Sequence, residues 1–254
     1  MAKKEDKSLP VNWQEEMAAH AQASAEMVKP ESSTISLRGG IVSYSGTPVP
    51  DNKLQVIVLG FIHEHNFYDH AYDADNPGSP ECFAFGTDFS EMAPHENAED
   101  PQSTVCAGCP NLEWGSGNGR GKACQQRVRL MCVPATGIDS VQQLLSAEVA
   151  IIKLPVTSVK YWNQYIQQVA GMYKRPEWGV ITEVSAEPDA KTQFKATFTP
   201  VAGVDFTDQP ELYGAIQQKI ELSQPILYRA YEPNAEVEKP KPKSKARKNS
   251  KARA

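Results

Sequence analysis

Four of the five cysteines lie within residues 82–124, at a spacing that suits a metal ion. Cys106-Ala-Gly-Cys109 is a C-x-x-C turn, in which the glycine lets two thiolates face one ion. Fourteen residues separate Cys109 from Cys124, and twenty-three separate Cys82 from Cys106. The spacing predicts a closed, structural site of four thiolates holding Zn²⁺. An iron–sulfur cluster uses the same ligands and stays open as an alternative.

The other interpretation is that Cys106 and Cys109 are surface thiols or a redox pair, and that Cys82 and Cys124 are small buried hydrophobes. The metal is favoured because residues 63–123 are rich in Gly and Pro and poor in apolar residues. Such a segment needs a cross-link, such as a bound metal ion, to become ordered. A thiolate site contributes on the order of 10 kcal/mol to folding. The fifth cysteine, Cys132, lies in an apolar run and is expected in the core.

Histidines near the cysteines could replace one of them as a ligand: His63, His65, His70 and His95. A catalytic zinc needs an open coordination position and a general base, but the chain has neither H-x-x-x-H nor H-x-E followed by C-x-x-C. The pattern therefore predicts a structural site, and it does not point to an enzyme.

A stretch without acidic residues follows the C-x-x-C turn, between Trp114 and Leu130. It combines a glycine-rich run with cations that could follow a phosphate backbone, while aromatic side chains could stack on unpaired bases. The run does not match a P-loop, because Ser116 stands at the first glycine position and Ala123 follows Lys122. A miniature core and a solvated charged face are the alternatives. The candidate nucleic-acid-binding residues are Tyr68, Tyr72, Trp114, Arg120, Lys122, Arg127 and Arg129.

The charge of the chain is unevenly distributed. Its 254 residues carry a formal charge of −5, but residues 239–254 hold eight Lys and Arg and no acid. This leaves 18 basic against 31 acidic residues in 1–238, so that an acidic body precedes a basic tail. The sequence shows neither a secretory signal nor a run long and apolar enough to span a membrane, and we expect a protein of the host cytoplasm without disulfides.

The elements that must position these residues alternate between strands and helices. A leading helix is expected at 13–28, and strands at 35–44 and 54–62 form a long hairpin with a bend at Gly39-Gly40. After an insertion at about 63–124 come a strand at 127–133, a short helix near 141–145 and a strand at 148–154. A helix capped by Ser158 buries Trp162, strands follow at 179–187 and 192–199, and a last helix ends near 222.

This order predicts an α+β, mainly β fold, an OB-like five-stranded barrel with a metal-stapled insertion and flanking helices. Another α+β sheet is the alternative. The predicted organisation is a basic N-terminus and leading helix at 1–30, a core at 31–232 that includes the insertion, and a disordered basic tail at 233–254.

The insertion carries a series of short strings: Tyr68-Asp, Tyr72-Asp-Ala-Asp-Asn-Pro, Pro80-Glu-Cys-Phe-Ala, Pro94-His, Pro101-Gln, Cys106-x-x-Cys-Pro-x-x-x-Trp-Gly-Ser and Gly121-Lys-Ala-Cys-x-x-Arg. Together they resemble a family of tailed-phage proteins described as single-stranded-DNA-binding, over about residues 35–200. The resemblance implies a phage replication-associated protein whose family cysteines are Cys82, Cys106, Cys109 and Cys124. A looser likeness is to the single-strand binders of T-even phages, which have a different ligand set.

The leading hypothesis is therefore a non-enzymatic phage protein that binds single-stranded DNA during replication or recombination, with phage replication proteins as further partners and no membrane contact. The competing hypothesis is an interaction or virion-associated protein that uses the cysteine insertion as a docking module. The two differ in whether the acidic body touches DNA at all.

Overall fold

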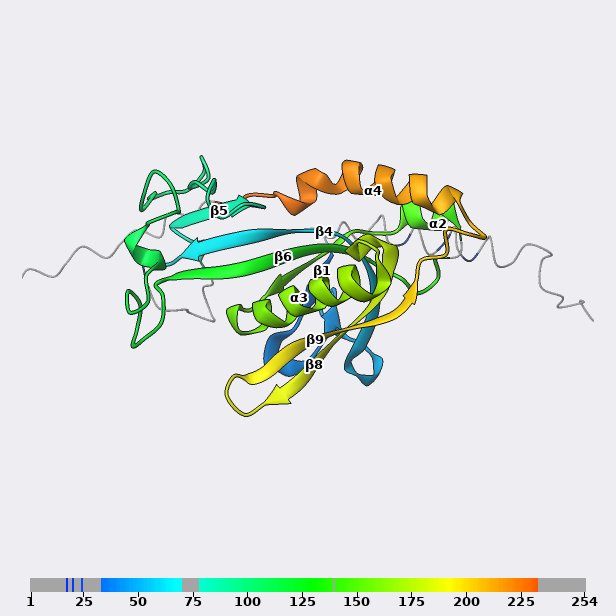
Figure 1. The fold of residues 1–254 in the computed structure, drawn as a ribbon, viewed down its shortest axis with the longest axis horizontal. Helices are drawn as coiled ribbons and strands as arrows, with labels where there is room; N and C mark the ends of the chain where they lie inside the picture. Colours follow the sequence, from blue (N-terminus) through cyan, green and yellow to red (C-terminus); the bar gives the residue numbers. More distant parts are fainter. Residues whose placement is uncertain are drawn as a thin grey trace, which may run out of the picture. The chain divides into compact units, whose positions relative to one another are not determined.

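The computed structural model describes residues 33–69, 78–138 and 140–232, together with Met17, His20 and Ser24, which are helical (Figure 1). The rest of the predicted leading helix, the basic tail from 233 on, His70 and Tyr72 lie outside the described residues. The chain divides into two compact units. Unit 1 holds Met1–Ile62 and Arg127–Tyr228, and unit 2 holds His63–Gln126 and Arg229–Ala254.

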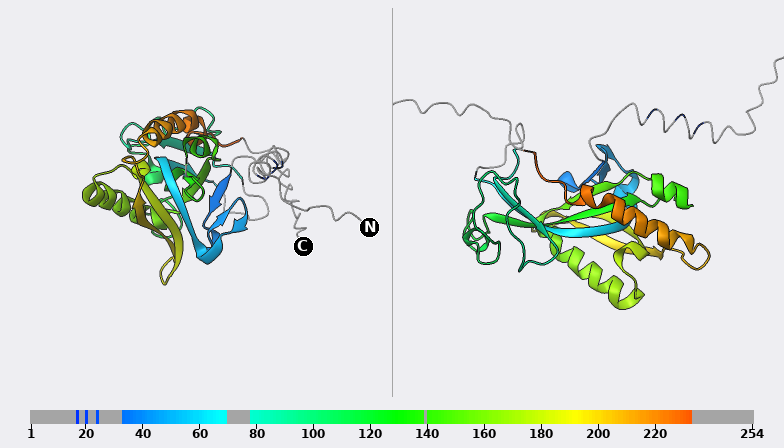
Figure 2. Two further views of the ribbon diagram at one scale, coloured as in Figure 1. Left: turned by 90° about the vertical axis from the view of Figure 1, so that its right-hand side faces the viewer. Right: turned by 90° about the horizontal axis from the view of Figure 1, so that it is seen from above.

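Unit 1 is built on a sheet that runs in the order β3-β2-β1-β7-β6-β4-β8-β9. β1 pairs in parallel with β7, whereas β7 with β6, β4 with β8, and β8 with β9 are antiparallel. The strands curl out of one plane without closing (Figure 2). Their bounds are β1 Thr34–Ser36, β2 Ser43–Tyr44, β3 Thr47–Pro48, β4 Lys53–Phe67, β6 Cys124–Pro134, β7 Ala150–Leu154, β8 Val180–Asp189 and β9 Gln193–Gly203.

The predicted α+β class is confirmed, as a curled open sheet with few helices. The predicted closed barrel of five strands is not what the sheet shows. Its path already takes eight strands within the described residues, and a ninth, β5, pairs with β4 off that path. The helix α3 (Val156–Gln168) does follow an inner strand, β7, as the sequence pattern suggested, but the extra strands leave the sheet open.

The central strands of unit 1 are buried on both faces, which explains their continuous apolar runs. Val56 and Val58 of β4 belong to one core cluster with Trp162 of α3. The alternate residue Ile57 lines a pocket with Ile216 of α4 (Glu211–Leu227). Because successive strand residues point to opposite faces, a strand with helices on both sides must be apolar throughout. Trp162 is fully buried, as its place on the predicted helix face indicated.

The first predicted hairpin has a different construction. Residues 35–44 do not form one strand, because Gly39 and Gly40 adopt left-handed φ angles of 63° and 76° within η1 (Arg38–Gly40). The chain turns there, and β1 pairs antiparallel with β2 through Ile35 and Tyr44. The predicted sharp bend is confirmed, but the prediction of one strand that continues through it is wrong. A further 3-10 turn, η2 (Pro50–Asn52), leads into β4.

The predicted cap of α3 is also wrong. The N-cap position is Pro155, which makes no side-chain cap bond. Ser158 lies inside the helix, is fully buried, and its Oγ accepts a hydrogen bond of 3.0 Å from the backbone N–H of Ala196 in β9. The hydroxyl therefore fastens the helix to the sheet instead of starting the helix. A π-turn, η4 (Val169–Tyr173), and a 3-10 turn, η5 (Glu177–Gly179), connect α3 to β8.

Two helices of unit 1 are joined by a buried lysine. Lys219 of α4 donates from Nζ to the carbonyl oxygens of Leu145 and Ala147, at 2.7 Å and 2.6 Å. These carbonyls lie at the C-terminal end of α2 (Val141–Ser146), where helix carbonyls lack intrahelical partners. Burial lowers the pKa of Lys219. The lysine stabilises the packing of α2 against α4 by capping one helix from the other.

Unit 2 has little regular structure. β5 (Cys82–Gly86) pairs antiparallel with the end of β4, with Ala84 opposite His65, and η3 (Pro110–Leu112) follows later. An aromatic cluster forms around Phe83, Phe85, His95 and Tyr231. The Tyr231 hydroxyl donates to the carboxylate of the fully buried Glu64, and Asn66 Nδ2 donates to the same oxygen at 3.1 Å.

Candidate metal centre and nucleic-acid interface

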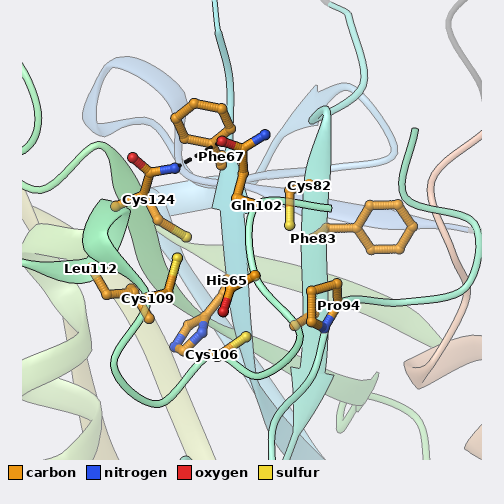
Figure 3. Close-up of a pocket in the computed structure, with 13 residues that line it drawn as sticks. His65, Phe67, Cys82, Phe83, Pro94, Gln102, Cys106, Cys109, Leu112 and Cys124 are labelled. Carbon is orange, nitrogen blue, oxygen red and sulfur yellow. Dashed lines mark hydrogen bonds between the residues drawn. The ribbon is translucent and has the colours of Figure 1, made fainter. Parts of the chain in front are cut away.

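Four buried cysteines of unit 2 line one small pocket, as their spacing predicted (Figure 3). Cys82 begins β5, Cys124 begins β6, and Cys106 and Cys109 lie in the turn before η3. The pocket has a volume of about 10 Å³, and His65 of β4 also lines it. None of the five cysteines, all in the described part of the chain, forms a disulfide. The fold thus gathers four thiols from three distant segments.

The C-x-x-C turn is held by its backbone. The N–H of Cys109 donates to the carbonyl of Cys106 at 3.1 Å, and the N–H of Cys106 donates to the carbonyl of Met92 at 2.8 Å. Gly108 has a φ of 80°, and a Cβ placed on it would meet nothing within 4 Å, so that the backbone conformation and not a lack of space favours glycine there. The turn sits on a small apolar cluster of Ala84, Met92 and Cys106.

The thiols perturb one another. Burial, together with the charges of the other three cysteines, raises the pKa of Cys124 to about 12. Burial likewise raises the pKa of Cys106 to about 11, with Cys82 and Cys109 adding to the shift. Backbone N–H groups of Asn66 and Gln102 act in the opposite direction on Cys124 and Cys82, because they donate hydrogen bonds to sulfur. In the absence of a cation these groups are therefore thiols at neutral pH.

The pocket brings together side chains of types that bind metals, but these side chains do not form a coordination sphere. Among residues 33–69, 78–138 and 140–232, no three Cys, His, Asp or Glu side chains are arranged so that they could hold a metal ion as they stand. Closing four sulfur atoms on one ion requires their side chains to rotate within the pocket. The three segments that carry them already meet there.

His65 is the histidine that shares the pocket. Its side chain is 3% exposed, and Nδ1 has no hydrogen-bond partner among the described residues. Burial, together with the positive charges of His63 and Lys122, lowers its pKa to about 4. The ring is therefore neutral at pH 7. Of the predicted alternative ligands, His63 and His95 do not line the pocket.

The predicted nucleic-acid-binding residues of unit 2 lie mostly at its surface. Trp114 is 80% exposed, and Lys122 Nζ lies 5.2 Å from the centre of its ring. Arg120 is exposed, and Tyr68 is half-buried. The glycine run folds tightly, since a Cβ added at Gly117 would lie 2.8 Å from backbone atoms of Lys122. Trp114 and Lys122 thus form one aromatic and cationic pair on an ordered loop.

The last two predicted cations belong to unit 1 and differ from each other. Arg129 is 2% exposed and donates from Nη1 to the carbonyl of Leu227 at 3.0 Å, at the end of α4. A guanidinium engaged in this way caps a helix and is not available to a phosphate, which corrects the prediction for Arg129. Arg127 is half-buried and lines a groove.

This groove, here called the basic groove, has a volume of about 630 Å³ and lies wholly within unit 1. Three cations from three different segments line it, Arg38 of η1, Arg127 of β6 and Lys153 of β7. None of its lining residues, all of them described, is acidic. The remaining ones are Thr34, Ile35, Ser36, Leu37, Ser43, Gly46, Ile151, Pro155 and Phe194.

Sequence reasoning missed Arg38, Lys153 and Phe194. Lys153 left a signal, because it is the one cation in the apolar strand Ala150–Leu154 and is exposed between buried neighbours. Arg38 stands beside the two glycines of η1, which marked a bend but gave no indication of a binding surface. Phe194 of β9 would lie 3.3 Å from a Cβ placed on Gly40, a tight contact at a residue whose φ of 76° already favours glycine.

Within the described residues, no helix is long and apolar enough to cross a bilayer. Comparison of the chain with protein-family models, with curated proteins and with solved structures finds no match.

Proposed function

We propose that the chain binds single-stranded DNA through the basic groove, as a non-enzymatic protein of phage DNA replication or recombination in the host cytoplasm. The observation that carries the proposal is the grouping of Arg38, Arg127 and Lys153 around a groove free of acids, in a chain whose formal charge is −5. A protein with excess negative charge attracts a phosphate backbone only through such a local patch.

The composition of the groove supports a single strand over a duplex. Beside the cations, Phe194 offers an aromatic ring, and the hydroxyls of Thr34, Ser36 and Ser43 can donate to phosphate or sugar oxygens. Binding of unpaired bases without sequence preference combines cations that follow the backbone with rings on which bases stack. In unit 2, Trp114 with Lys122 offers the same pair of chemistries. The phage setting is supported by the sequence strings of residues 68–127.

Binding of a fluorescent oligo-dT, measured by anisotropy over a range of salt concentrations, tests the proposal. Three phosphate contacts predict a log–log slope of the association constant against salt of about −2, at roughly −0.7 per contact on a single strand. Lys153→Ala should weaken binding and reduce the slope by about 0.7. Arg38→Ala/Arg127→Ala/Lys153→Ala should remove groove binding altogether.

A matched control is Lys191→Ala, which removes the same charge from the exposed β8–β9 turn at a residue that does not line the groove. Its affinity and salt slope should equal those of the unaltered protein. Circular dichroism of each variant shows whether the fold is intact. If the folded triple variant binds oligo-dT as well as Lys191→Ala does, the groove is not the binding site.

A second candidate function, protein docking through unit 2, is favoured by three exposed apolar side chains, Phe89 at 44%, Val105 at 46% and Trp114 at 80%. Contiguous apolar surface in contact with solvent marks an interaction site, and these three side chains belong to the same unit. A purified phage replication protein that binds the chain after nuclease treatment, and loses binding to Trp114→Ala, would support this function. Docking together with an absence of oligo-dT binding at low salt would replace the first proposal with the second.

A further inference from the structure

The cysteine pocket of unit 2 has three properties that together point to a cation. Cys82, Cys106, Cys109 and Cys124 come from three segments far apart in the chain, yet line one pocket and form no disulfide with one another. The chain between β5 and β6 carries, in its described part, only the one-turn helix η3 and a small apolar cluster. Such a segment lacks the buried apolar surface that would order it unaided.

A buried nitrogen without a partner is the independent observation. His65 lines the same pocket, is 3% exposed, and its Nδ1 meets no acceptor or donor among the described residues. Buried polar atoms are almost always hydrogen-bonded, so that an exception marks a place where a partner is missing. The four cysteines line the same pocket as His65, and a metal-bound thiolate sulfur accepts a hydrogen bond from an imidazole N–H.

The chemistry of the pocket selects among metal ions. A volume of about 10 Å³ has room for a single ion or one water molecule. Soft thiolates in a set of four favour Zn²⁺ among the common divalent ions, whereas Mg²⁺ and Ca²⁺ require oxygen ligands. A set of four protein ligands leaves no open position for a reacting water.

We propose that unit 2 binds one structural Zn²⁺ ion through the sulfur atoms of Cys82, Cys106, Cys109 and Cys124, with His65 donating a supporting hydrogen bond to one thiolate. Each cysteine releases one proton to solvent as its sulfur binds, and no electron is transferred. Rotation of the four side chains within the pocket closes the site. The inference stands whether or not the basic groove binds DNA.

Metal analysis of the full chain, purified without chelator, tests the stoichiometry. We expect one zinc per chain, a colourless protein, and an intense thiolate-to-metal charge-transfer band when Co²⁺ replaces zinc. Cys106→Ser/Cys109→Ser should lose the metal. Cys132→Ala is the matched control, because this fifth cysteine is fully buried in the core of unit 1 and does not line the pocket, and it should keep one zinc. Zinc retained at full stoichiometry by the double variant overturns the proposal.

A measurement on the unaltered protein covers the case in which the double variant does not fold. Titration with an organomercurial should release one zinc as four thiols react, and a chromogenic chelator measures the zinc that is released. Absence of zinc or of its release, or a brown protein with bound iron, rejects the assignment. His65→Ala should retain one zinc but lose it faster to the chelator. If His65→Ala lacks zinc while Cys82→Ser keeps it, histidine is a ligand and the four-thiolate set is wrong.

Discussion

Replacing Asn52 by alanine should destabilise the region that positions Arg38 in the basic groove. The Asn52 side chain makes three hydrogen bonds. Its Oδ1 accepts from the N–H of Val42 at 2.6 Å, and its Nδ2 donates to the carbonyls of Gly40 and Ala186, each at 2.9 Å. Asn52 therefore ties η1 and β2 to β8. Its own φ of 58° lies in the left-handed region, which asparagine tolerates better than alanine does.

The expected loss can be worked out from these contacts. Three hydrogen bonds contribute about 1 kcal/mol each, and the N–H of Val42, which is fully buried, is left without its acceptor. Alanine in the left-handed region adds about 1 kcal/mol. Asn52→Ala should thus lower the free energy of unfolding by roughly 4 kcal/mol. Asn52→Gly loses the same hydrogen bonds without the backbone strain, and should be about 1 kcal/mol less destabilised than Asn52→Ala.

Hydrogen exchange read at single amides is the most direct assay, because the amide of Val42 reports the broken bond itself. Its protection should fall steeply in both variants, by about tenfold for each 1.4 kcal/mol, while the β8–β9 amides change less. Urea denaturation gives the global value. The reasoning fails if Asn52→Ala stays within 1 kcal/mol of the unaltered protein, or if the Val42 amide remains protected. If Asn52→Ala binds oligo-dT as tightly as the unaltered protein does, the position of Arg38 does not matter for DNA binding.

Further predictions concern one residue each. Trp162→Ala should cost about 3–5 kcal/mol of unfolding free energy in urea, because a fully buried ring packed edge-on against Phe198 is lost, whereas Trp114→Ala should cost less than about 0.5 kcal/mol. Burial raises the pKa of Glu177, so the native state binds its proton more tightly than the unfolded state does. Its charge then opposes folding above the raised pKa, and Glu177→Gln should raise the melting temperature at pH 7 but not below the ordinary carboxyl pKa of 4.5. Tyr231→Phe removes the hydroxyl that donates to Glu64, and should speed amide exchange in β5 by weakening unit 2 by about 1.5–3 kcal/mol.

The elements that could be predicted from sequence are those whose residues repeat with a regular period. The strands predicted at 54–62 and 127–133 and the helix predicted around Trp162 are elements of the right type near the right positions. Ser158 was misinterpreted because its partner, the N–H of Ala196, lies 38 residues away, and local pattern cannot distinguish a cap from a long-range bond. The strand predicted at 35–44 is longer than β1 for a similar reason, because the parallel partner of β1 is the distant strand β7.

The two candidate sites differ in how far the sequence reveals them. The cysteines carry their chemistry in their residue type, so their spacing predicted a site of four thiolates, and the structure places all four in one pocket. The basic groove gathers Arg38, Arg127 and Lys153 from three segments, and no local run of charge connects them. In one case a stretch of basic residues led to a wrong prediction. Arg129 shares an acid-free stretch with Arg127, but a helix end takes up its guanidinium.

The bond between Tyr231 and Glu64 joins residues 167 positions apart, and it sets an order on the growing chain. A ribosome adding about 5–20 residues per second needs roughly 10–30 s to travel from one to the other. Throughout that time the buried carboxylate of Glu64 lacks this donor, and the rings of Phe83 and Phe85 lack the Tyr231 ring that packs on them. Unit 2 can therefore be completed only after β8 and β9 of unit 1 have been synthesised, and its nascent form is open to chaperones and proteases for longer than its short sequence suggests.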